Sequence, residues 1–190
     1  HEVARLVSDS GARLLLHDHG AAKVAASVAR RWPDFDVRAV DGESGAPLVG
    51  AGPGGRGAFP VRRTPPRTLA VLLYTSGSEG HPRGAMLSHG ALRTNVDALA
   101  RLRRPAAMTS DDVVLVVLPL FHIFGLNAGL ALAARVGATC LLMERFDARA
   151  SLAAIREHGV TMVAGAPPMY VAWSAEGALR ESMDGVRLLV

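Results

Sequence analysis

The sequence predicts an α/β fold in which mostly parallel sheets are flanked by helices. Short apolar runs of strand length, such as residues 113–118 and 160–164, alternate with stretches whose apolar residues recur at helical spacing. Helix signals stand between these runs, with Ser88 and Asp147 at expected starts and Gly159 at an expected end. Strands that alternate with helices along the chain imply parallel β-α-β crossovers.

Each element is expected from its own pattern and its flanking residues. The predicted strands are residues 14–16, 36–40, 69–74, 113–118, 138–143, 160–164 and 186–190. The predicted helices are the stretch before Gly11, residues 21–31, residues 89–103, a buried helix within 120–135, residues 147–159, and a helix whose first turn holds Pro167 and Pro168.

The chain divides by composition into three stretches of one partial domain. Residues 1–40 form an α/β segment, and residues 68–190 form a second α/β region. Between them, residues 41–67 are rich in glycine and proline and lack apolar periodicity, which predicts a linker or a long surface loop.

Composition excludes several classes of protein. Of the 190 residues 49% are hydrophobic and 20% are charged, so the chain is not intrinsically disordered. The net charge of +4 is spread along the chain rather than gathered on one face, which argues against nucleic-acid binding. The one cysteine, Cys140, lies in an apolar run, so a buried thiol is expected, with no disulfide framework, in a cytoplasmic protein.

Three further features of the sequence suggest a function but lack the context that it requires. Gly50, Gly52 and Gly55 satisfy G-x-G-x-x-G, but the prolines that follow prevent the helix that a dinucleotide site requires. The trio at residues 17–19, two histidines around an aspartate, has no second cluster to complete a metal shell. Residues 113–134 carry no charge, yet a strand, a turn and a buried helix explain them better than a membrane span.

Residues 69–92 carry the chemistry. An apolar run of residues 69–74, expected to be a strand buried on both faces of a parallel sheet, leads into a polar glycine loop. Glycines allow backbone N–H groups to converge on phosphate oxygens, hydroxyls add donors, and Arg83 adds a forked cation. The spacing is not that of a Walker A loop, because no lysine follows at the required position.

The loop resembles that of the adenylate-forming enzymes, a family that includes acyl-CoA synthetases, luciferases and peptide-synthetase adenylation domains. Its usual pattern, [YF]TSG[ST]TGxPKG, stands here as residues 74–84, with Glu79 in place of a threonine and Arg83 in place of the lysine. Residues 119–125 and 165–170 resemble two further family segments, in the same order along the chain.

The resemblance implies the large N-terminal domain of such an enzyme, most like a fatty-acid CoA ligase, and an interior fragment of it. The implied substrates are a carboxylic acid, ATP and CoA, with Mg²⁺ as cofactor. The implied ATP and phosphate contacts are Thr75, Ser76, Gly77, Ser78, Glu79, Gly80 and Arg83, with Thr75 also a Mg²⁺ contact. The implied acyl-pocket residues are His122, Phe124, Gly125, Asn127, Ala166 and Pro167, and no catalytic residue is expected within the chain.

Alternatives remain open on the sequence. A peptide-synthetase adenylation domain and a non-catalytic phosphate-binding module would both keep the loop, and a membrane-associated protein would use the uncharged run. His122 has two interpretations, a core residue with satisfied nitrogens or a wall of the acyl pocket. Oligomeric state is not predicted.

Overall fold

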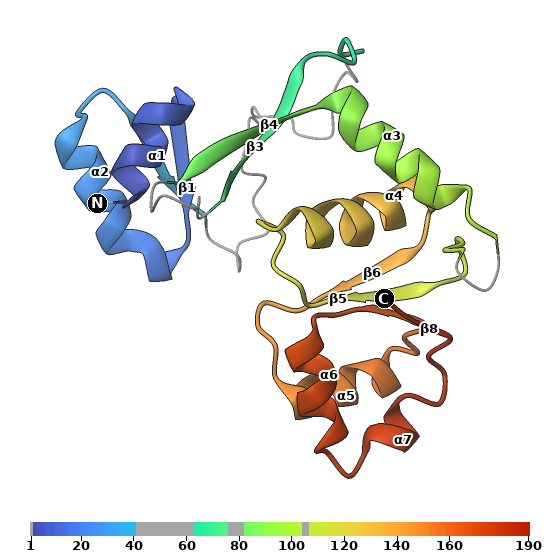
Figure 1. Ribbon diagram of the computed structural model, residues 1–190. Helices are drawn as coiled ribbons and strands as arrows, with labels where there is room; N and C mark the ends of the chain where they lie inside the picture. The colour runs from blue at the N-terminus through green and yellow to red at the C-terminus, as the bar shows by residue number, and fades with distance from the viewer. Residues whose placement is uncertain (1, 41–62, 76–81, 104–106) are drawn as a thin grey trace, which may run out of the picture. The chain divides into compact units, whose positions relative to one another are not determined.

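The computed structural model describes residues 2–40, 63–75, 82–103 and 107–190, and the chain forms two units, His1–Arg63 and Thr64–Val190. The predicted linker lies almost entirely outside the described residues, as does the G-x-G-x-x-G pattern. Figure 1 labels the helices and strands.

The first unit is a small α/β segment. Its strands β1 (Leu14–His17) and β2 (Asp36–Ala39) pair in parallel. The helices are α1 (Glu2–Ser10), a 3-10 turn η1 (His19–Ala21) and α2 (Ala22–Arg31). Helix α1 ends where Gly11 adopts a φ of +64°, a conformation that glycine takes without strain.

The second unit is built on a parallel sheet of four strands in the order β6-β5-β7-β8. These strands are β5 (Val113–Val116), β6 (Thr139–Leu142), β7 (Met162–Ala164) and β8 (Leu188–Leu189). The helices are α3 (His89–Ala100), the π-helix η2 (Phe124–Ala131), α4 (Leu132–Val136), α5 (Ala148–Glu157), α6 (Pro167–Ser174) and α7 (Leu179–Ser182).

Helices cover both faces of this sheet (Figure 1). Alternate residues of β5 point to opposite sides, so each face has apolar residues for the helices to pack against. On one face Leu115 packs in a cluster with Leu152 of α5 and Trp173 of α6. On the other face Val114 and Val116 pack with α3 and α4. The predicted α/β fold is therefore confirmed.

The strand at residues 69–74 is placed differently from the prediction. Strand β3 (Leu69–Thr75) pairs antiparallel with β4 (Arg83–Ser88), a strand the sequence analysis missed. Its inner residues are half-buried rather than buried on both faces. An unbroken apolar run indicates a strand but not its partner, so the expectation of a parallel sheet here was wrong.

A buried carboxylate joins the starts of three parallel strands. Asp112, Thr161 and Arg187 immediately precede β5, β7 and β8. The hydroxyl of Thr161 donates to Asp112 Oδ1 over 2.7 Å, and Arg187 Nε donates to the same oxygen over 2.9 Å. Arg187 Nη2 also pairs with Asp112 Oδ2, which accepts further hydrogen bonds from Thr109.

Candidate nucleotide- and acid-binding site

The β3–β4 hairpin holds the two ends of the phosphate loop together. Thr75 and Arg83 are paired across the antiparallel ladder, and both are exposed. Gly84 faces Tyr74, where a Cβ would come within 2.9 Å of Leu72 Cδ1 and 3.3 Å of the Tyr74 ring. A glycine therefore allows the strand that leaves the loop to pack closely against the strand that enters it.

Five of the seven predicted phosphate contacts, Ser76, Gly77, Ser78, Glu79 and Gly80, lie outside the described residues. The structure places only the flanking pair, Thr75 and Arg83. Of these, Thr75 offers a hydroxyl oxygen, a ligand type that Mg²⁺ accepts. Within the described ranges no three or more His, Cys, Asp or Glu side chains gather as a metal site.

Helix α3 begins directly after the hairpin, with Ser88 at its start as the sequence predicted. Ser88 caps it, accepting the N–H of Ala91 over 3.1 Å. The N–H of His89 donates to Thr68 O over 3.0 Å, and that of Gly90 donates to Pro66 O over 2.7 Å. These bonds tie the start of α3 to the segment that enters β3, so the hairpin and α3 form one connected element.

The two predicted acyl segments meet at one edge of the parallel sheet. Val116 at the end of β5 is in register with Ala164 at the end of β7. From there the chain after β5 enters η2 on the α3 side, whereas the chain after β7 enters α6 on the α5 side. Adjacent strands whose connections leave to opposite faces open a crevice at their carboxyl ends, the usual ligand site of parallel sheets.

The segment after β5 continues as a π-helix, a form that is rare and common at functional sites. Gly125 lies against backbone, and a Cβ there would be 2.8 Å from Pro119 O and 2.9 Å from Leu118 O. The amide of Asn127 is only 5% exposed and its Nδ2 donates to Asn95 Oδ1 on α3 over 2.6 Å. Sequence analysis missed Asn95, because its partner is 32 positions away.

Two cavities flank the π-helix, and Phe124 and Ala128 line both. The smaller, of about 290 Å³, lies between η2 and α3 and has Asn95 and Asn127 in its lining. The larger, of about 350 Å³, is lined by apolar residues, including Ala164 at the end of β7. Of the predicted acyl-pocket residues, Phe124 and Asn127 thus face cavities.

His122 is exposed, and its ring lies 4.9 Å from that of Phe121 between centroids. It lies just before η2, with its backbone N–H donating to Pro119 O over 3.0 Å. In the described part of the chain its side chain is therefore not in the core. The described lining of the two cavities does not include it.

The other predicted acyl segment follows β7. Ala166 is half-buried and precedes α6, and Pro167, the first residue of α6, is exposed. The N–H of Gly165 donates to Val190 O over 3.0 Å, and the Tyr170 hydroxyl donates to the same oxygen over 2.7 Å. These bonds hold the segment against the end of the neighbouring strand β8.

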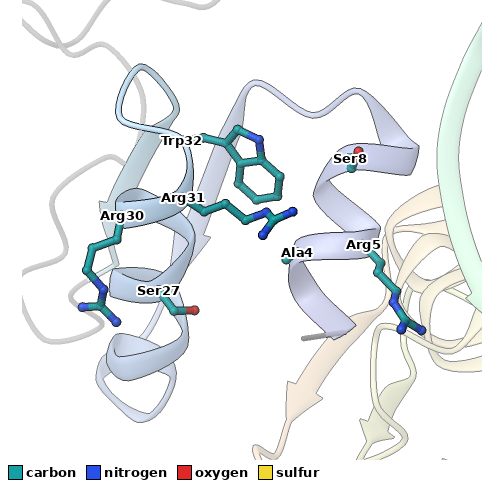
Figure 2. A pocket seen from close by; sticks show the side chains of 7 residues that line it. All are labelled: Ala4, Arg5, Ser8, Ser27, Arg30, Arg31 and Trp32. Atoms are coloured by element: carbon teal, nitrogen blue, oxygen red, sulfur yellow. The ribbon is translucent and has the colours of Figure 1, made fainter.

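The first unit holds a separate cleft of about 590 Å³ between α1 and α2 (Figure 2). The Arg31 guanidinium lies 5.3 Å from the Trp32 ring and reaches between the helices, whereas Arg5 and Arg30 extend away from it. The three cations do not converge on one point, so the cleft has no evident anion site. In the same unit Asp18 caps η1, accepting the N–H of Ala21 over 2.9 Å.

Comparison with known proteins decides the family. Residues 1–190 match the family described as AMP-binding enzyme. The chain belongs to this family. No helix in the described ranges has the length and apolar character needed to cross a membrane.

The names of individual relatives are more specific than the family description. The chain is 30% identical to 4-coumarate–CoA ligase 1 of Oryza sativa subsp. japonica, over all of the chain and 35% of that ligase. It is 33% identical to feruloyl-CoA synthase of Amycolatopsis sp, over all of the chain and 36% of that enzyme. ATP-bound MatB from Rhodopseudomonas palustris superposes with a TM-score of 0.79 at 26% identity, covering all of the chain and 37% of MatB. The chain thus spans about a third of these relatives.

Proposed function

We propose that the protein containing this chain is an ATP-dependent acid–thiol ligase. In the first step a carboxylate oxygen bonds to the α-phosphorus of ATP, the bond from that phosphorus to the bridging oxygen breaks, and pyrophosphate leaves. In the second step the CoA thiol gives its proton to solvent and the sulfur bonds to the acyl carbon. The bond from that carbon to the phosphate oxygen breaks, and AMP leaves as an anion. Charge on phosphate oxygens rises in the first step, so donors held in place beforehand accelerate it.

The register of β5 and β7 carries this proposal. It brings the segments after Val116 and Ala164 to one crevice, although 48 positions separate the paired residues. A crevice at the carboxyl ends of parallel strands, lined on one side by an apolar helix, suits an organic acid. Membership of the AMP-binding family and the resemblance of the phosphate loop support ATP as the activating substrate.

The residue roles belong to the same proposal. The residues that bind ATP are Thr75, Ser76, Gly77, Ser78, Glu79, Gly80 and Arg83. Backbone N–H groups of this loop and three of its hydroxyls, those of Thr75, Ser76 and Ser78, grip the β- and γ-phosphates. Mg²⁺ would neutralise charge on the phosphate oxygens, and Thr75 would supply one of its contacts. His122, Phe124, Gly125, Asn127, Ala166 and Pro167 border the acid. His122 would donate a hydrogen bond to the carboxylate and act as a movable wall rather than as a general base.

The acid is proposed to be aromatic rather than a long-chain fatty acid. The two cavities beside η2, of about 290 and 350 Å³, are compact and each has Phe124 in its wall. Offset or edge contact with an aromatic ring would favour a planar acid there. The names of the relatives, which refer to 4-coumarate and feruloyl-CoA, point the same way.

Pyrophosphate exchange tests both proposals. The full-length protein should incorporate labelled pyrophosphate into ATP when 4-coumaric or ferulic acid is present, and should form the CoA thioester when CoA is added. Palmitic acid and a panel of amino acids serve as comparison substrates. Faster exchange with palmitate would restore the fatty-acid assignment, and exchange only with amino acids would indicate a peptide-synthetase adenylation domain. Absence of exchange with every acid would leave a phosphate-binding module without ligase activity.

A further inference from the structure

The amide of Asn127 is a buried polar group in an otherwise apolar helix. Helix η2 reads FGLNAGLA, so Asn127 is its one residue with a polar side chain. Its neighbours Leu126 and Ala128 are half-buried and apolar. A buried amide is costly unless it forms hydrogen bonds, so the bond to Asn95 offsets a real penalty.

The bond spans two elements to which we have assigned different substrates. Asn95 is on α3, which follows directly from the hairpin of the phosphate loop. Asn127 is on η2, in the wall of the proposed acid site. Farther along, the Asp97–Arg135 ion pair joins α3 to α4, the helix that follows η2, at an exposed position where such pairs contribute little. The amide pair is a partly buried polar contact of this seam, with Asn127 buried and Asn95 exposed.

The local backbone makes the side-chain contact important. In η2 the carbonyl of Asn127 accepts the N–H of Leu132, five residues on, the spacing of a π-turn. Close packing of Gly125 on the backbone of residues 118 and 119 fixes the start of η2. The Asn95 bond fixes the orientation of Asn127 near the middle of η2, next to the cavity that both asparagines line.

We propose that Asn95 is a positioning residue for the acid site. By accepting the hydrogen bond of Asn127 it holds η2, and with it Phe124, in the conformation that receives the acid. Asn95 itself need not touch either substrate. This inference rests on the proposed function and assigns to α3 a role in selecting the acid in addition to its place beside the phosphate loop.

Substitutions at position 95 in the full-length protein separate the hydrogen bond from side-chain bulk. Asn95→Leu keeps a similar shape but removes the acceptor, and Asn95→Asp keeps an acceptor for Asn127. Thr94→Leu adds the same apolar side chain at the adjacent exposed position of α3. Steady-state rates with varied 4-coumaric acid and with varied ATP give separate KM values for the two substrates.

We expect Asn95→Leu to raise the KM for the acid by roughly tenfold, the scale expected when a buried donor loses its partner, and to leave the KM for ATP within about twofold. Asn95→Asp and Thr94→Leu should stay close to wild type. In a double-variant cycle with Asn127→Leu, the two losses should not add, because both remove the same bond. Equal acid KM values in wild type and Asn95→Leu, or equal losses in the Leu and Asp variants, would overturn the inference.

Hydrogen exchange provides a readout that does not need activity. Amides of residues 124–131 should exchange about tenfold faster in Asn95→Leu than in wild type or Thr94→Leu, because η2 loses its side-chain anchor. Unchanged exchange there would refute the positioning role even if no acid is activated. A wild-type protein that shows protected η2 amides but activates no acid would instead count against the proposed function.

Discussion

Asp112 is the residue whose contribution to stability the structure defines best. The Arg187 guanidinium lowers the pKa of Asp112 well below its usual range; burial opposes this, and hydrogen bonds from Thr109 and Thr161 add to it. Its side chain is 4% exposed and that of Arg187 is 25% exposed, so solvent screens the pair little. Asp112→Asn leaves the guanidinium without its counter-charge and should lower the free energy of unfolding by about 2 to 4 kcal/mol.

The pH dependence of that loss is set by the direction of the shift. A carboxyl whose pKa is lower in the folded state than in the unfolded state stabilises the fold fully above the unfolded pKa, near 3.8, and this stabilisation is lost as the pH falls further. Urea denaturation of wild type and Asp112→Asn should therefore show their largest difference at pH 7 and a smaller one at pH 3. An equal difference at both values would contradict the ion-pair explanation.

His122 tests the pocket at the level of a single side chain. His122→Ala in the full-length protein should reduce kcat/KM for the acid by roughly tenfold and alter the preference among acids, because a hydrogen bond to the carboxylate and a wall of the pocket are lost. The KM for ATP and the melting temperature should change little, since the side chain is exposed. A sharply lower melting temperature with an unchanged acid profile would assign His122 to packing instead.

Arg83 tests the phosphate loop. Arg83→Ala removes a cation and its charge-assisted hydrogen bonds, so adenylation by the full-length protein should slow by roughly tenfold to a hundredfold. Arg93→Ala on the exposed surface of α3 is the matched control, because it removes the same charge away from the loop. Pyrophosphate exchange measured at varied ATP distinguishes them, and equal rates in the two variants would exclude Arg83 from phosphate binding.

At the scale of elements, the π-helix depends on a glycine. Gly125→Ala would place a Cβ within 2.9 Å of two backbone oxygens, which cannot move as a side chain would, so η2 must shift. We expect a loss of about 1 to 3 kcal/mol in unfolding free energy and a higher KM for the acid. At Gly177 a Cβ would meet nothing within 4 Å, so Gly177→Ala is the control in thermal denaturation and kinetics. Equal stability of both variants would show that η2 is not packed closely against the backbone of residues 118 and 119 at Gly125.

The hairpin shows how an element can be recognised and still be assigned wrongly to a sheet. Its first strand was expected from the apolar run, yet its partner β4 is formed by residues 83–88, where the pattern is weak. Pairing rather than propensity makes that strand, because β3 supplies its hydrogen-bonding partner. The consequence for function is direct: the antiparallel pair brings Thr75 and Arg83, which stand at the two ends of the loop, side by side.

At the scale of the whole molecule, we expect the 190-residue chain to be folded but inactive by itself. It holds one phosphate loop and the proposed acid crevice, and it spans about a third of the length of the CoA ligases it matches. Pyrophosphate exchange should be absent from this chain and present in the full-length protein at equal concentration. Robust exchange by the chain alone would show that these 190 residues suffice for adenylation.

The sequence by itself determined the elements that depend on neighbouring residues. Caps such as Ser88 and Asp147, the proline start of α6 and the buried β5 were all predicted, because each follows from contacts a few positions apart. The three segments that resemble the family were also recognised from the sequence alone, and they indicated the chemistry without any knowledge of how the strands pair.

The tertiary structure alone decided which distant residues meet. Tertiary pairing made β3 antiparallel to β4, the order of the parallel strands brought Asp112 to Arg187, and packing of η2 on α3 joined Asn127 to Asn95. The helix predicted after β5 is a π-helix, and its Gly125 lies against the backbone that leaves the strand. Local patterns report whether a residue is buried but not what covers it, since the partner is set by the register and order of strands far apart in the chain.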